Sequence, residues 1–378
     1  MIPATFMQDE TIEWTSFLGR MPDVIDPEVV RNSLEGKRVL ITGAGGYIGS
    51  ALTRYLGNAS LQLLVLLDIA EQGLFELGME LDDQECITPR ALIVGDVCDP
   101  ALIREIFEDH RPQIVFHAAA CKHVSLMEAN PFTAAHNNVL GTHRLLEAAN
   151  NARAEQVIVI STDKAADPTG IMGATKRVAE LLVLANDGPT QVKAVRLANV
   201  LGSTGSVGPI FVRQIARGGP LTITDPACTR YFLSIDEVVK SLVSALAADA
   251  ASAVLVAVAG EPFSIVSLAH FLVQNASLVP DKVEIKHTGL RPGDKLTERM
   301  IASDESATPS NVASLQKISP THPIAVSTLG AAIEEMDAAI RVRDLRHLLD
   351  AITRLIPAYR PSRQLQQQAD AEKTETMA

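Results

Sequence analysis

Short apolar runs alternate with longer stretches of helical periodicity along most of this chain. From Arg38 onward, the runs VLIT, LQLLVLLD and ALIVGD are each followed by such a stretch, at 47–56, 71–80 and 101–109 respectively. Strands that alternate with helices in this way pair in parallel and carry helices on both faces. The pattern therefore predicts an α/β fold with a Rossmann-type, doubly wound parallel sheet.

Three more predicted strands, PQIVFHAAA, QVIVIST and VKAVRLA, extend this alternation toward Gly202. The alternation weakens beyond that point, returns in a helical stretch at 235–248 and an apolar run at 254–258, and weakens again. A smaller, interleaved C-terminal domain is therefore predicted. The predicted organisation is a helical lead-in at 1–36, a Rossmann domain at 37–202 plus about 235–260, a smaller domain at 203–234 plus 261–357, and a polar, flexible tail at 358–378.

Composition and charge narrow the class of protein. The chain has 378 residues and a formal net charge of -12, which disfavours a general surface for nucleic acid. Its apolar runs, such as 61–67, are far too short to cross a bilayer, and no charged-then-apolar leader opens it. The four cysteines are widely spaced, without a zinc-like pair or a disulfide framework. We expect a cytoplasmic protein with reduced thiols, no nucleic-acid partner and no membrane insertion.

The segment VLITGAGGYIGS predicts a strand, a phosphate loop and a helix. Its three glycines have the spacing at which the first permits a tight turn, the second admits a pyrophosphate and the third lets helix pack on strand. Asp68, about 20 residues further on, can accept hydrogen bonds from both hydroxyls of an adenosine ribose. An ordinary strand-turn-helix is the alternative, but it would not require the acid. The predicted dinucleotide contacts in the loop are Gly43, Gly46, Tyr47, Ile48 and Gly49.

Residues that follow the other predicted strands should converge with this loop, because ligands of open α/β sheets lie beyond the carboxyl ends of the strands. Asp96, next to Val97, can accept from an adenine amino group. The fourth strand leads into HAAACKHV, where Lys122 can reach a substrate phosphate or a sugar. The small residues that leave room there for a flat dinucleotide are Ala118, Ala119 and Ala120.

The segment after the fifth strand, STDKAADPTGIMGATK, carries the most reactive chemistry. It places a hydroxyl, a carboxylic acid and an amine in succession at Thr162, Asp163 and Lys164. A second amine, Lys176, lies about one helical turn after Met172. An acid and a base adjacent in sequence can serve opposite ends of one elimination, which fits dehydration better than simple alcohol oxidation.

These motifs occur in the order and spacing of the extended short-chain dehydrogenases/reductases. Within that group the sequence most resembles the UDP-N-acetylglucosamine 4,6-dehydratases of bacterial polysaccharide biosynthesis, from about Phe17 to about Pro357. The glycine loop and GATK alone would indicate only the superfamily, whereas STDKA with TRYF and GLRPGDKL is much narrower. The segments that carry the resemblance are TGAGGYIG, HAAACKHV, NNVLGT, STDKA, GATK, RLANVLGSTGSV, TRYF and GLRPGDKL.

The resemblance implies NAD(P)-dependent conversion of a UDP-N-acetylhexosamine to a 4-keto-6-deoxy sugar nucleotide. Oxidised nicotinamide takes a hydride from carbon 4, a base removes the carbon-5 proton, an acid protonates the departing 6-hydroxyl, and the hydride returns to carbon 6. By the same resemblance Lys164 is the base and Asp163 the acid, while Thr162 bonds the 4-oxygen and Lys176 holds the nicotinamide ribose. For Lys164 to act as a base its pKa must be lowered, and burial and the neighbouring Lys176 are the expected causes.

Met172 departs from the superfamily pattern, because most members carry at this position the tyrosine that deprotonates the alcohol. Methionine cannot transfer a proton, so ordinary dehydrogenase or 4-epimerase chemistry is disfavoured. The larger branch of the 4,6-dehydratases resembles this chain in having methionine there. Lys176, a water relayed through Thr162 and a substrate phosphate are the candidate acceptors of the 4-hydroxyl proton. A UDP-sugar 4-epimerase and a non-catalytic nucleotide-sugar binder are the alternative functions.

The substrate contacts also follow from the resemblance. Asn199 is expected to hold a diphosphate oxygen or the sugar, and Arg230 and Arg291 to neutralise the UDP phosphates. The plainer alternatives are that Arg291 only orders a turn and that Arg230 is a surface charge. Glu298 either accepts from a ribose hydroxyl or is a helix-start carboxylate. These contacts make the smaller domain the expected substrate-binding domain.

Other features are expected to be structural. The histidines at positions 117, 123, 136 and 143 have no carboxylate or cysteine at a suitable spacing, so no metal site is predicted. Asn137 and Asn138 are expected to tie a helix to the loop after the fourth strand. A homo-oligomer is expected, with a dimer built from helices that flank the sheet.

The cofactor is expected to be NAD. Asp68 would repel the additional phosphate of NADP, and no arginine follows it in DIAEQG. NADP stays possible, because relatives of this type often use it.

Overall fold

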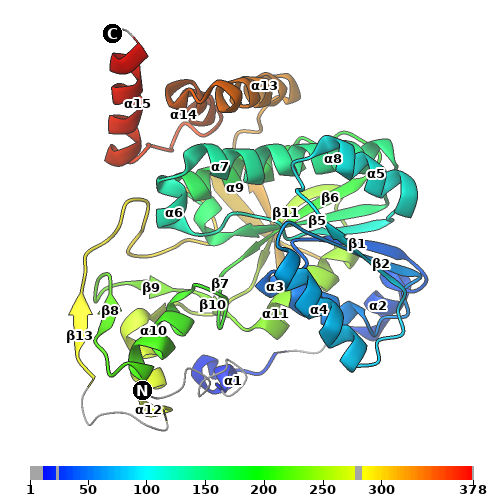
Figure 1. Cartoon of the computed structure of the whole chain (residues 1–378), viewed down its shortest axis with the longest axis horizontal. Helices are drawn as coiled ribbons and strands as arrows, with labels where there is room; N and C mark the ends of the chain where they lie inside the picture. Colours follow the sequence, from blue (N-terminus) through cyan, green and yellow to red (C-terminus); the bar gives the residue numbers. More distant parts are fainter. Residues whose placement is uncertain (1–11, 23–24, 277–282, 377–378) are drawn as a thin grey trace.

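The sheet predicted from the alternating pattern is present, and it has nine strands (Figure 1). The structure, a computed structural model, describes residues 12–22, 25–276 and 283–376. In spatial order the strands are β14 (Glu305–Pro309), β15 (Leu315–Pro320), β11 (Ser252–Ala257), β6 (Gln191–Leu197), β5 (Gln156–Thr162), β4 (Ile114–His117), β1 (Arg38–Thr42), β2 (Leu63–Asp68) and β3 (Arg90–Val94). The strands from β11 to β3 are parallel, whereas β15 and β14 are antiparallel additions at one edge. The predicted Rossmann-type α/β fold is confirmed.

Helices cover both faces of this sheet (Figure 1). One face carries α2 (Pro27–Leu34), α3 (Tyr47–Leu56), α4 (Glu71–Asp83), α11 (Ile235–Ser244) and the 3-10 helix η5 (Ala245–Ala247). The other carries α5 (Pro100–His110), α6 (Val124–Glu128), α7 (Pro131–Ala135), the π-helix η3 (His136–Gly141), α8 (Thr142–Asn151) and α9 (Ile171–Leu184). An outer layer over α7, η3 and α9 consists of α13 (Val326–Val342) and α14 (Leu345–Leu355). No helix in the described part of the chain is both long enough and apolar enough to span a bilayer.

Each face of the sheet has its own apolar core. Successive residues of a strand point to opposite faces, so Val115 of β4 enters one core and Phe116 the other. Both side chains are fully buried. This burial on both sides explains why the strands appear in the sequence as nearly continuous apolar runs.

A smaller lobe lies beside the sheet, at the lower left of Figure 1. Its helices are α1 (Trp14–Leu18), α10 (Val207–Ala216) and α12 (Ile265–Gln274). Its strands pair as β7 (Asn199–Val200) with β10 (Phe232–Leu233), β8 (Leu221–Ile223) with β13 (Ile285–His287), and β9 (Thr229–Arg230) with β12 (Phe263–Ser264). A separate apolar core, in which Phe17 of α1 contacts Phe232 and Phe263, holds this lobe together.

The structure corrects the predicted domain boundaries. Residues 305–320, assigned from the sequence to the substrate-binding domain, form the last two strands of the main sheet, and α13 and α14 pack on its helices. The predicted lead-in is divided, because α1 packs in the small lobe and α2 beside α11. Residues 1–11 and 23–24 of that lead-in lie outside the described residues.

The polar tail, predicted to be flexible, forms helix α15 (Arg363–Thr376). Leu365 and Ala369, one helical turn apart, are buried in the core next to α14. Just before the helix, Ser362 Oγ donates to Glu128 Oε2 at 2.7 Å. The prediction was wrong because two apolar residues at helical spacing anchor an otherwise polar segment; residues 377 and 378 lie outside the described part.

Local sequence chemistry explains several helix starts. Asp99 accepts from Ala101 N at 2.8 Å and precedes Pro100, which suits the first position of α5. Ser234 and Glu237 form a capping box that begins α11. In contrast, no N-cap side chain bonds the start of α3, which follows the glycine loop.

Candidate active site

The carboxyl ends of the parallel strands bring most of the predicted site residues to one edge of the sheet. β1, β4 and β5 are aligned so that Thr42 lies opposite His117, and His117 opposite Val159. The segments beginning at Gly43, Ala118 and Asp163 therefore leave the sheet on the same side. The predicted convergence is confirmed, whereas the roles of the individual residues stay predictions.

The glycine loop has the shape that a dinucleotide pyrophosphate needs. A Cβ added to Gly43 would lie 2.6 Å from Ala119 N, and one added to Gly49 would lie 2.0 Å from Gly43 O. Because α3 has no side-chain cap, its first turn offers backbone donors and the positive end of the helix dipole to an anion. Tyr47 Oη donates to Leu201 O at 2.9 Å, and the half-buried Ile48 packs on the core below the loop.

The acids predicted to contact the adenosine are oriented by backbone amides. Asp68 Oδ2 accepts from Gly45 N and Oδ1 from Ala70 N, each at 2.8 Å. Each oxygen keeps a lone pair for a ribose hydroxyl. Asp96 Oδ1 accepts from Cys98 N at 2.8 Å. The side chain of Val97 is buried in the core, so its backbone is the part that a cofactor could meet.

The predicted acid and base are in direct contact at the end of β5. Lys164 Nζ donates to Asp163 Oδ1 at 2.9 Å and to Asn199 Oδ1 at 3.0 Å. Thr162 Oγ1 donates to the same Asp163 oxygen at 2.9 Å. Asp163 is fully buried, and its Oδ2 has no hydrogen-bond partner among the described residues. Glu298 Oε1 lies 4.0 Å from Lys164 Nζ. We call Asp163, Lys164, Asn199 and Glu298 the site cluster.

The charge state of Lys164 differs from the prediction. Burial alone would lower the pKa of Lys164, but the carboxylates of Asp163 and Glu298 outweigh it, and the pKa is raised. The expected influence of Lys176 is therefore wrong as an explanation of this group. Lys176 is itself the perturbed amine, since burial lowers its pKa to about 8.

The segment that follows the small lobe holds the loop after β5 in place. Lys295 Nζ donates to Ala166 O at 2.8 Å and forms an ion pair with Glu298 Oε2 at 3.1 Å. Asp167 accepts from Ser303 N and from Ser303 Oγ, the latter at 2.8 Å. Sequence reasoning missed Lys295 and Asp167, although the first lies within GLRPGDKL and the second within the segment that follows STDKA.

Two of the expected structural roles are borne out by the contacts. His117 is buried between Thr42 Oγ1 at 2.8 Å and Thr142 Oγ1 at 3.0 Å, and burial lowers its pKa to about 3, so it is neutral. Asn138 accepts from Cys121 N at 2.8 Å and donates to Cys121 O at 3.0 Å, and Asn137 accepts from the same amide. The two asparagines tie η3 to the loop after β4, as predicted.

The side chain of Met172 is buried in the apolar core on the α9 side of the sheet. It is therefore surrounded by hydrocarbon, and the position offers no proton-transfer group. Lys176, one turn further along α9, is also buried.

The two arginines predicted to contact the substrate phosphates already bond other groups of the protein. Arg230 donates to the carbonyls of Thr229, Lys295 and Leu296, so three backbone groups already hold its guanidinium. Arg291 is 58% exposed and bonds Asp294 across a turn, which matches the plainer alternative. Lys122 is exposed on the loop after β4. Their contacts with a substrate stay predictions.

A carboxylate and a cysteine do approach one of the four histidines, although their spacing in the sequence did not suggest it. The fold brings Asp96, Cys98 and His136 together, with possible ligand atoms within 4.8 Å of one another. However, Cys98 Sγ donates to His136 O at 3.3 Å, and burial raises the pKa of this thiol to about 12. A protonated thiol is a poor metal ligand, so these contacts are those of a structural cluster.

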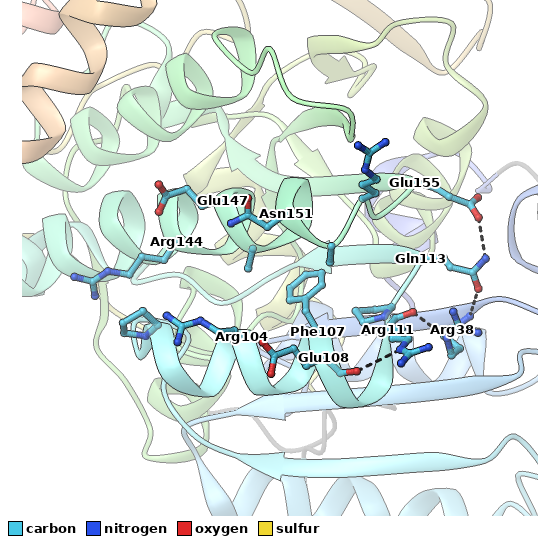
Figure 2. A pocket seen from close by; sticks show the side chains of 15 residues that line it. Arg38, Arg104, Phe107, Glu108, Arg111, Gln113, Arg144, Glu147, Asn151 and Glu155 are labelled. Carbon is cyan, nitrogen blue, oxygen red and sulfur yellow. Dashed lines mark hydrogen bonds between the residues drawn. The ribbon is translucent and has the colours of Figure 1, made fainter.

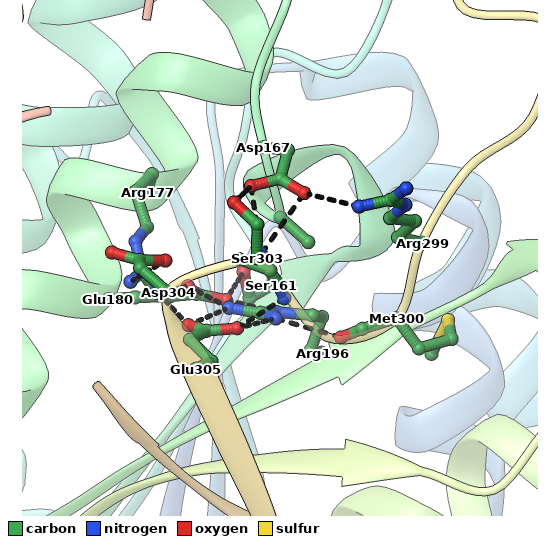
Figure 3. Close-up of polar contacts among 12 residues, drawn as sticks. Ser161, Asp167, Arg177, Glu180, Arg196, Arg299, Met300, Ser303, Asp304 and Glu305 are labelled. Carbon is green, nitrogen blue, oxygen red and sulfur yellow. Dashed lines mark hydrogen bonds and ion pairs between the residues drawn. The ribbon is translucent and has the colours of Figure 1, made fainter. Parts of the chain in front are cut away.

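A buried ion network is linked to the end of β5 through Ser161 (Figure 3). It consists of Arg177, Glu180, Arg196 and Glu305, and it joins α9, β6 and β14. Arg196 is fully buried, with Nη2 2.6 Å from Glu180 Oε2 and Nη1 2.8 Å from Glu305 Oε2. Ser161, next to the site cluster, donates to Glu180 Oε1 at 2.7 Å.

A groove of about 840 Å³ runs along α5 and α8, from Pro100 at the start of α5 to Gln113 beside β4 (Figure 2). Arg38 begins β1 and Gln113 precedes β4, so the groove borders the amino ends of these strands. It contains no predicted site residue. Its arginines include Arg111, and Arg38 Nε donates to Arg111 O, at the end of α5.

The glycine cradle at α3 and the reactive segment after β5 define an extended short-chain dehydrogenase/reductase. Over residues 39–320 the chain matches the polysaccharide biosynthesis protein family, and it belongs to that family. The structure of Pen from Bacillus thuringiensis has the same fold, with a TM-score of 0.69 and 28% identity over 76% of this chain and 89% of that one. The predicted membership is confirmed.

Relatives in the comparison carry two kinds of enzyme name. The probable polysaccharide biosynthesis protein EpsC of Bacillus subtilis is 38% identical over 79% of this chain and 50% of that protein, so the chain spans about half the length of this relative. A UDP-glucose 4-epimerase of Rickettsia rickettsii is 34% identical over 72% of this chain and 79% of its own. The UDP-N-acetylglucosamine 4,6-dehydratase (inverting) of Campylobacter jejuni is 32% identical over the same shares.

Proposed function

We propose that this protein catalyses the NAD(P)-dependent 4,6-dehydration of a UDP-N-acetylhexosamine, with UDP-N-acetylglucosamine as the first substrate to test. The observation that carries the proposal is the contact between Asp163 and Lys164, an acid and a base 2.9 Å apart where the reacting sugar would lie. The similarity to the Campylobacter jejuni dehydratase supports the same reaction.

The residues at the carboxyl edge fit a dinucleotide cofactor. The glycine-rich loop around Gly43 and the uncapped start of α3 would hold the pyrophosphate, and Asp68 the adenosine ribose. When bound, the nicotinamide supplies an acceptor for the carbon-4 hydride and returns that hydride to carbon 6. The negative charge of Asp68 favours NAD over NADP, because the additional phosphate would meet a carboxylate.

Lys164 must lose a proton before it can act, since its pKa is raised in the resting site. Transfer of that proton along the contact to Asp163 Oδ1 makes an amine and a carboxylic acid in one step. The amine then takes the proton from carbon 5, and the acid protonates the 6-hydroxyl as it leaves as water. The elimination leaves an ammonium on Lys164 and a carboxylate on Asp163. When the hydride returns to carbon 6, the Lys164 ammonium would give a proton back to carbon 5, and a solvent proton would then restore the resting ammonium.

The 4-hydroxyl proton needs a separate acceptor, because Met172 has none to offer. Lys176 is the favoured acceptor among the three candidates. With a pKa of about 8, the Lys176 amine can exchange a proton near neutral pH. Lys176 also lies one helical turn after Met172, on the same face of α9 as that residue.

UDP-sugar 4-epimerisation is the second candidate function, because a relative of 34% identity is named UDP-glucose 4-epimerase. An epimerase would use only the hydride exchange at carbon 4. It would give no role to the contact between Asp163 and Lys164, which is why we place it second.

The test is incubation of the purified protein with UDP-N-acetylglucosamine and NAD or NADP in deuterated water, followed by mass spectrometry and NMR. We expect the loss of one water and the appearance of deuterium at carbon 5, delivered by the exchangeable Lys164 ammonium. In Lys164→Ala, nucleotide-sugar binding should persist while product and deuterium incorporation are lost. Unchanged mass with a new 4-epimer would replace the proposal by the second candidate.

A further inference from the structure

Glu128 is a buried carboxylate outside the site cluster, and it joins two segments that lie far apart in the sequence. It is the last residue of α6 and is 1% exposed. Its Oε1 accepts from Ile171 N, at the start of α9, at 2.5 Å. Its Oε2 accepts from Ser362 Oγ, in the C-terminal segment, at 2.7 Å. Because each oxygen has a hydrogen bond, the orientation of the carboxylate is fixed.

The start of α9 depends on this carboxylate, because it has no cap of its own. The N-cap residue is Gly170, which has no side chain to accept a hydrogen bond. The free amides of the first turn and the positive end of the helix dipole favour a carboxylate there. Glu128 supplies from another helix the acceptor that Asp99 supplies locally to α5. A Cβ added to Gly170 would lie 2.9 Å from Glu128 Oε1, so the glycine leaves room for it.

The first turn of α9 is in direct contact with the site cluster. A Cβ added to Gly173 would lie 2.3 Å from Lys164 O, so the backbone of α9 packs on the backbone of Lys164 with no side chain between them. A packed interior transmits displacements, so a shift of this turn would move Lys164. Lys164 Nζ must keep its 2.9 Å contact with Asp163 Oδ1 for the proton transfer proposed above.

The turn that carries Arg291 meets the start of α9 at the same point. Thr169 Oγ1 donates to Gly293 O at 3.1 Å, and a Cβ added to Gly170 would lie 3.0 Å from Gly293 Cα. A Cβ added to Gly293 would lie 3.1 Å from Glu128 Oε1. Glu128 therefore lies where α6, the start of α9 and this turn come together.

The C-terminal segment packs around Glu128 at more than one residue. Tyr359 is fully buried, and its Oη has no hydrogen-bond partner among the described residues. Burial and, to a smaller extent, the charge of Glu128 raise the pKa of Tyr359, so the phenol stays protonated near the carboxylate. Further along, Leu365 and Ala369 anchor α15 in the core.

We propose that Glu128, held by Ser362 of the C-terminal segment, is a positioning residue for Lys164. It fixes the first turn of α9, which in turn fixes the backbone of Lys164 against Asp163 and Asn199. The inference rests on the proposed function only in so far as Lys164 is the carbon-5 base.

The first test is steady-state dehydration of UDP-N-acetylglucosamine by variants of the full chain. A misplacement of about 1 Å costs up to about 10²-fold in rate, so Glu128→Ala should lower kcat by roughly 10- to 100-fold. Glu128→Gln should stay within a few-fold of wild type, because its amide can accept from Ile171 N and donate to Ser362 Oγ. The matched control is Ser234→Ala, which removes the N-cap bond of α11 on the other face of the sheet and should leave kcat unchanged.

The second test follows Lys164 without any turnover. Trace acetylation by acetic anhydride, read by peptide mass spectrometry, reports how firmly the Lys164 amine is held, with the 56% exposed Lys286 as internal reference. Relative labelling of Lys164 should rise several-fold in Glu128→Ala and stay at the wild-type level in Glu128→Gln and Ser234→Ala. Ser362→Ala, which removes one bond to Glu128, should give a smaller rise.

Unchanged Lys164 labelling in both Glu128→Ala and Ser362→Ala would overturn the proposal, whatever happens to kcat. A Glu128→Ala enzyme with the kcat of wild type would also overturn it. If wild type forms no dehydrated product, the proposed function fails, and the labelling result alone then decides the positioning role. If Glu128→Ala does not fold, Ser362→Ala provides the same comparison with the same outcomes.

Discussion

The site cluster and the ion network are neighbouring groups of charged side chains, and they differ in how completely they are satisfied. In the ion network each buried charge has an opposite charge within hydrogen-bonding distance. In the site cluster, Asp163 Oδ2 and Glu298 Oε2 are buried without a hydrogen-bond partner in the described structure, although Lys295 forms an ion pair with the second. A satisfied network fixes one geometry, whereas an incomplete one retains acceptors for a substrate.

The two groups also differ in the solvent exposure of their charged side chains. Arg196 and Glu180 are fully buried, while the Lys164 side chain keeps 20% of its surface exposed. Unpaired charge is costly inside a protein but useful at an edge that ligands can reach. Replacing a carboxylate by an amide should therefore mainly lower activity in the site cluster and mainly lower stability in the ion network.

The largest expected effect is on catalysis by Asp163→Asn. The amide keeps the shape of the side chain but cannot supply the proton for the 6-hydroxyl, so kcat should fall by roughly 10²- to 10⁴-fold. The free energy of unfolding should fall by less than in Glu180→Gln, because Lys164 keeps 20% of its side-chain surface exposed and has Glu298 at 4.0 Å. Steady-state kinetics and urea unfolding measure the two quantities, and an unchanged kcat would contradict the assignment of the acid.

The matched substitution in the ion network, Glu180→Gln, should mainly affect stability. It leaves the fully buried Arg196 with Glu305 as its remaining carboxylate, and breaking a buried pair costs about 3–5 kcal/mol. Urea unfolding at neutral pH checks the loss. If Glu180→Gln is as stable as wild type, the prediction is contradicted, because the Glu180 carboxylate then contributes no more to stability than a hydrogen-bonded amide does.

Acid should remove the stability that the ion network contributes. Although burial favours the neutral acid, hydrogen bonds and charge from Arg196 hold the pKa of Glu305 at about 2, against 4.5 for the same carboxyl group in the unfolded chain. This carboxylate thus contributes fully above about pH 4.5 and loses its contribution, roughly 3 kcal/mol at most, as the pH falls toward 2.

Unfolding free energy measured across that pH window should fall more steeply for wild type than for Glu305→Gln, which has no carboxylate to protonate. Parallel curves for the two proteins would contradict the assigned role of Glu305.

The smallest effect is expected where the two groups meet. Ser161→Ala removes one hydrogen bond to Glu180 and should cost about 1 kcal/mol of stability. Because Asp163, Lys164 and Asn199 keep their contacts, kcat should stay within a few-fold of wild type. A loss of activity as large as that of Asp163→Asn would show that the two groups act as a single unit.

The sequence predicted the main sheet because buried parallel strands are apolar without interruption, as in VLIT and QVIVIST. It did not predict β14 and β15, since ESATP and LQKISP are polar and belong to the sheet only through pairing with β11. The anchored helix α15 was missed for a related reason. Its two buried residues are apparent only once α14 is in place.

The candidate residues could be located from the sequence because strand ends converge in an open α/β sheet. The protonation state of Lys164 could not be predicted, because Glu298, which helps to raise its pKa, comes from a distant segment of the chain. Likewise, the backbone carbonyls that hold Arg230 are supplied by residues 229, 295 and 296, which only the fold brings together.

The pairing of Arg196 with Glu305 has a consequence for biosynthesis. The two residues are 109 positions apart, so the ribosome completes β6 long before it supplies the partner of its arginine. A nascent chain that compacts around β1 to β6 must keep this guanidinium hydrated until residue 305 emerges, because burying it with Glu180 alone leaves the pair of arginines undercompensated. The ion network is therefore complete only after β14 has been synthesised, and a chain that ends before Glu305 should be less stable than the full chain.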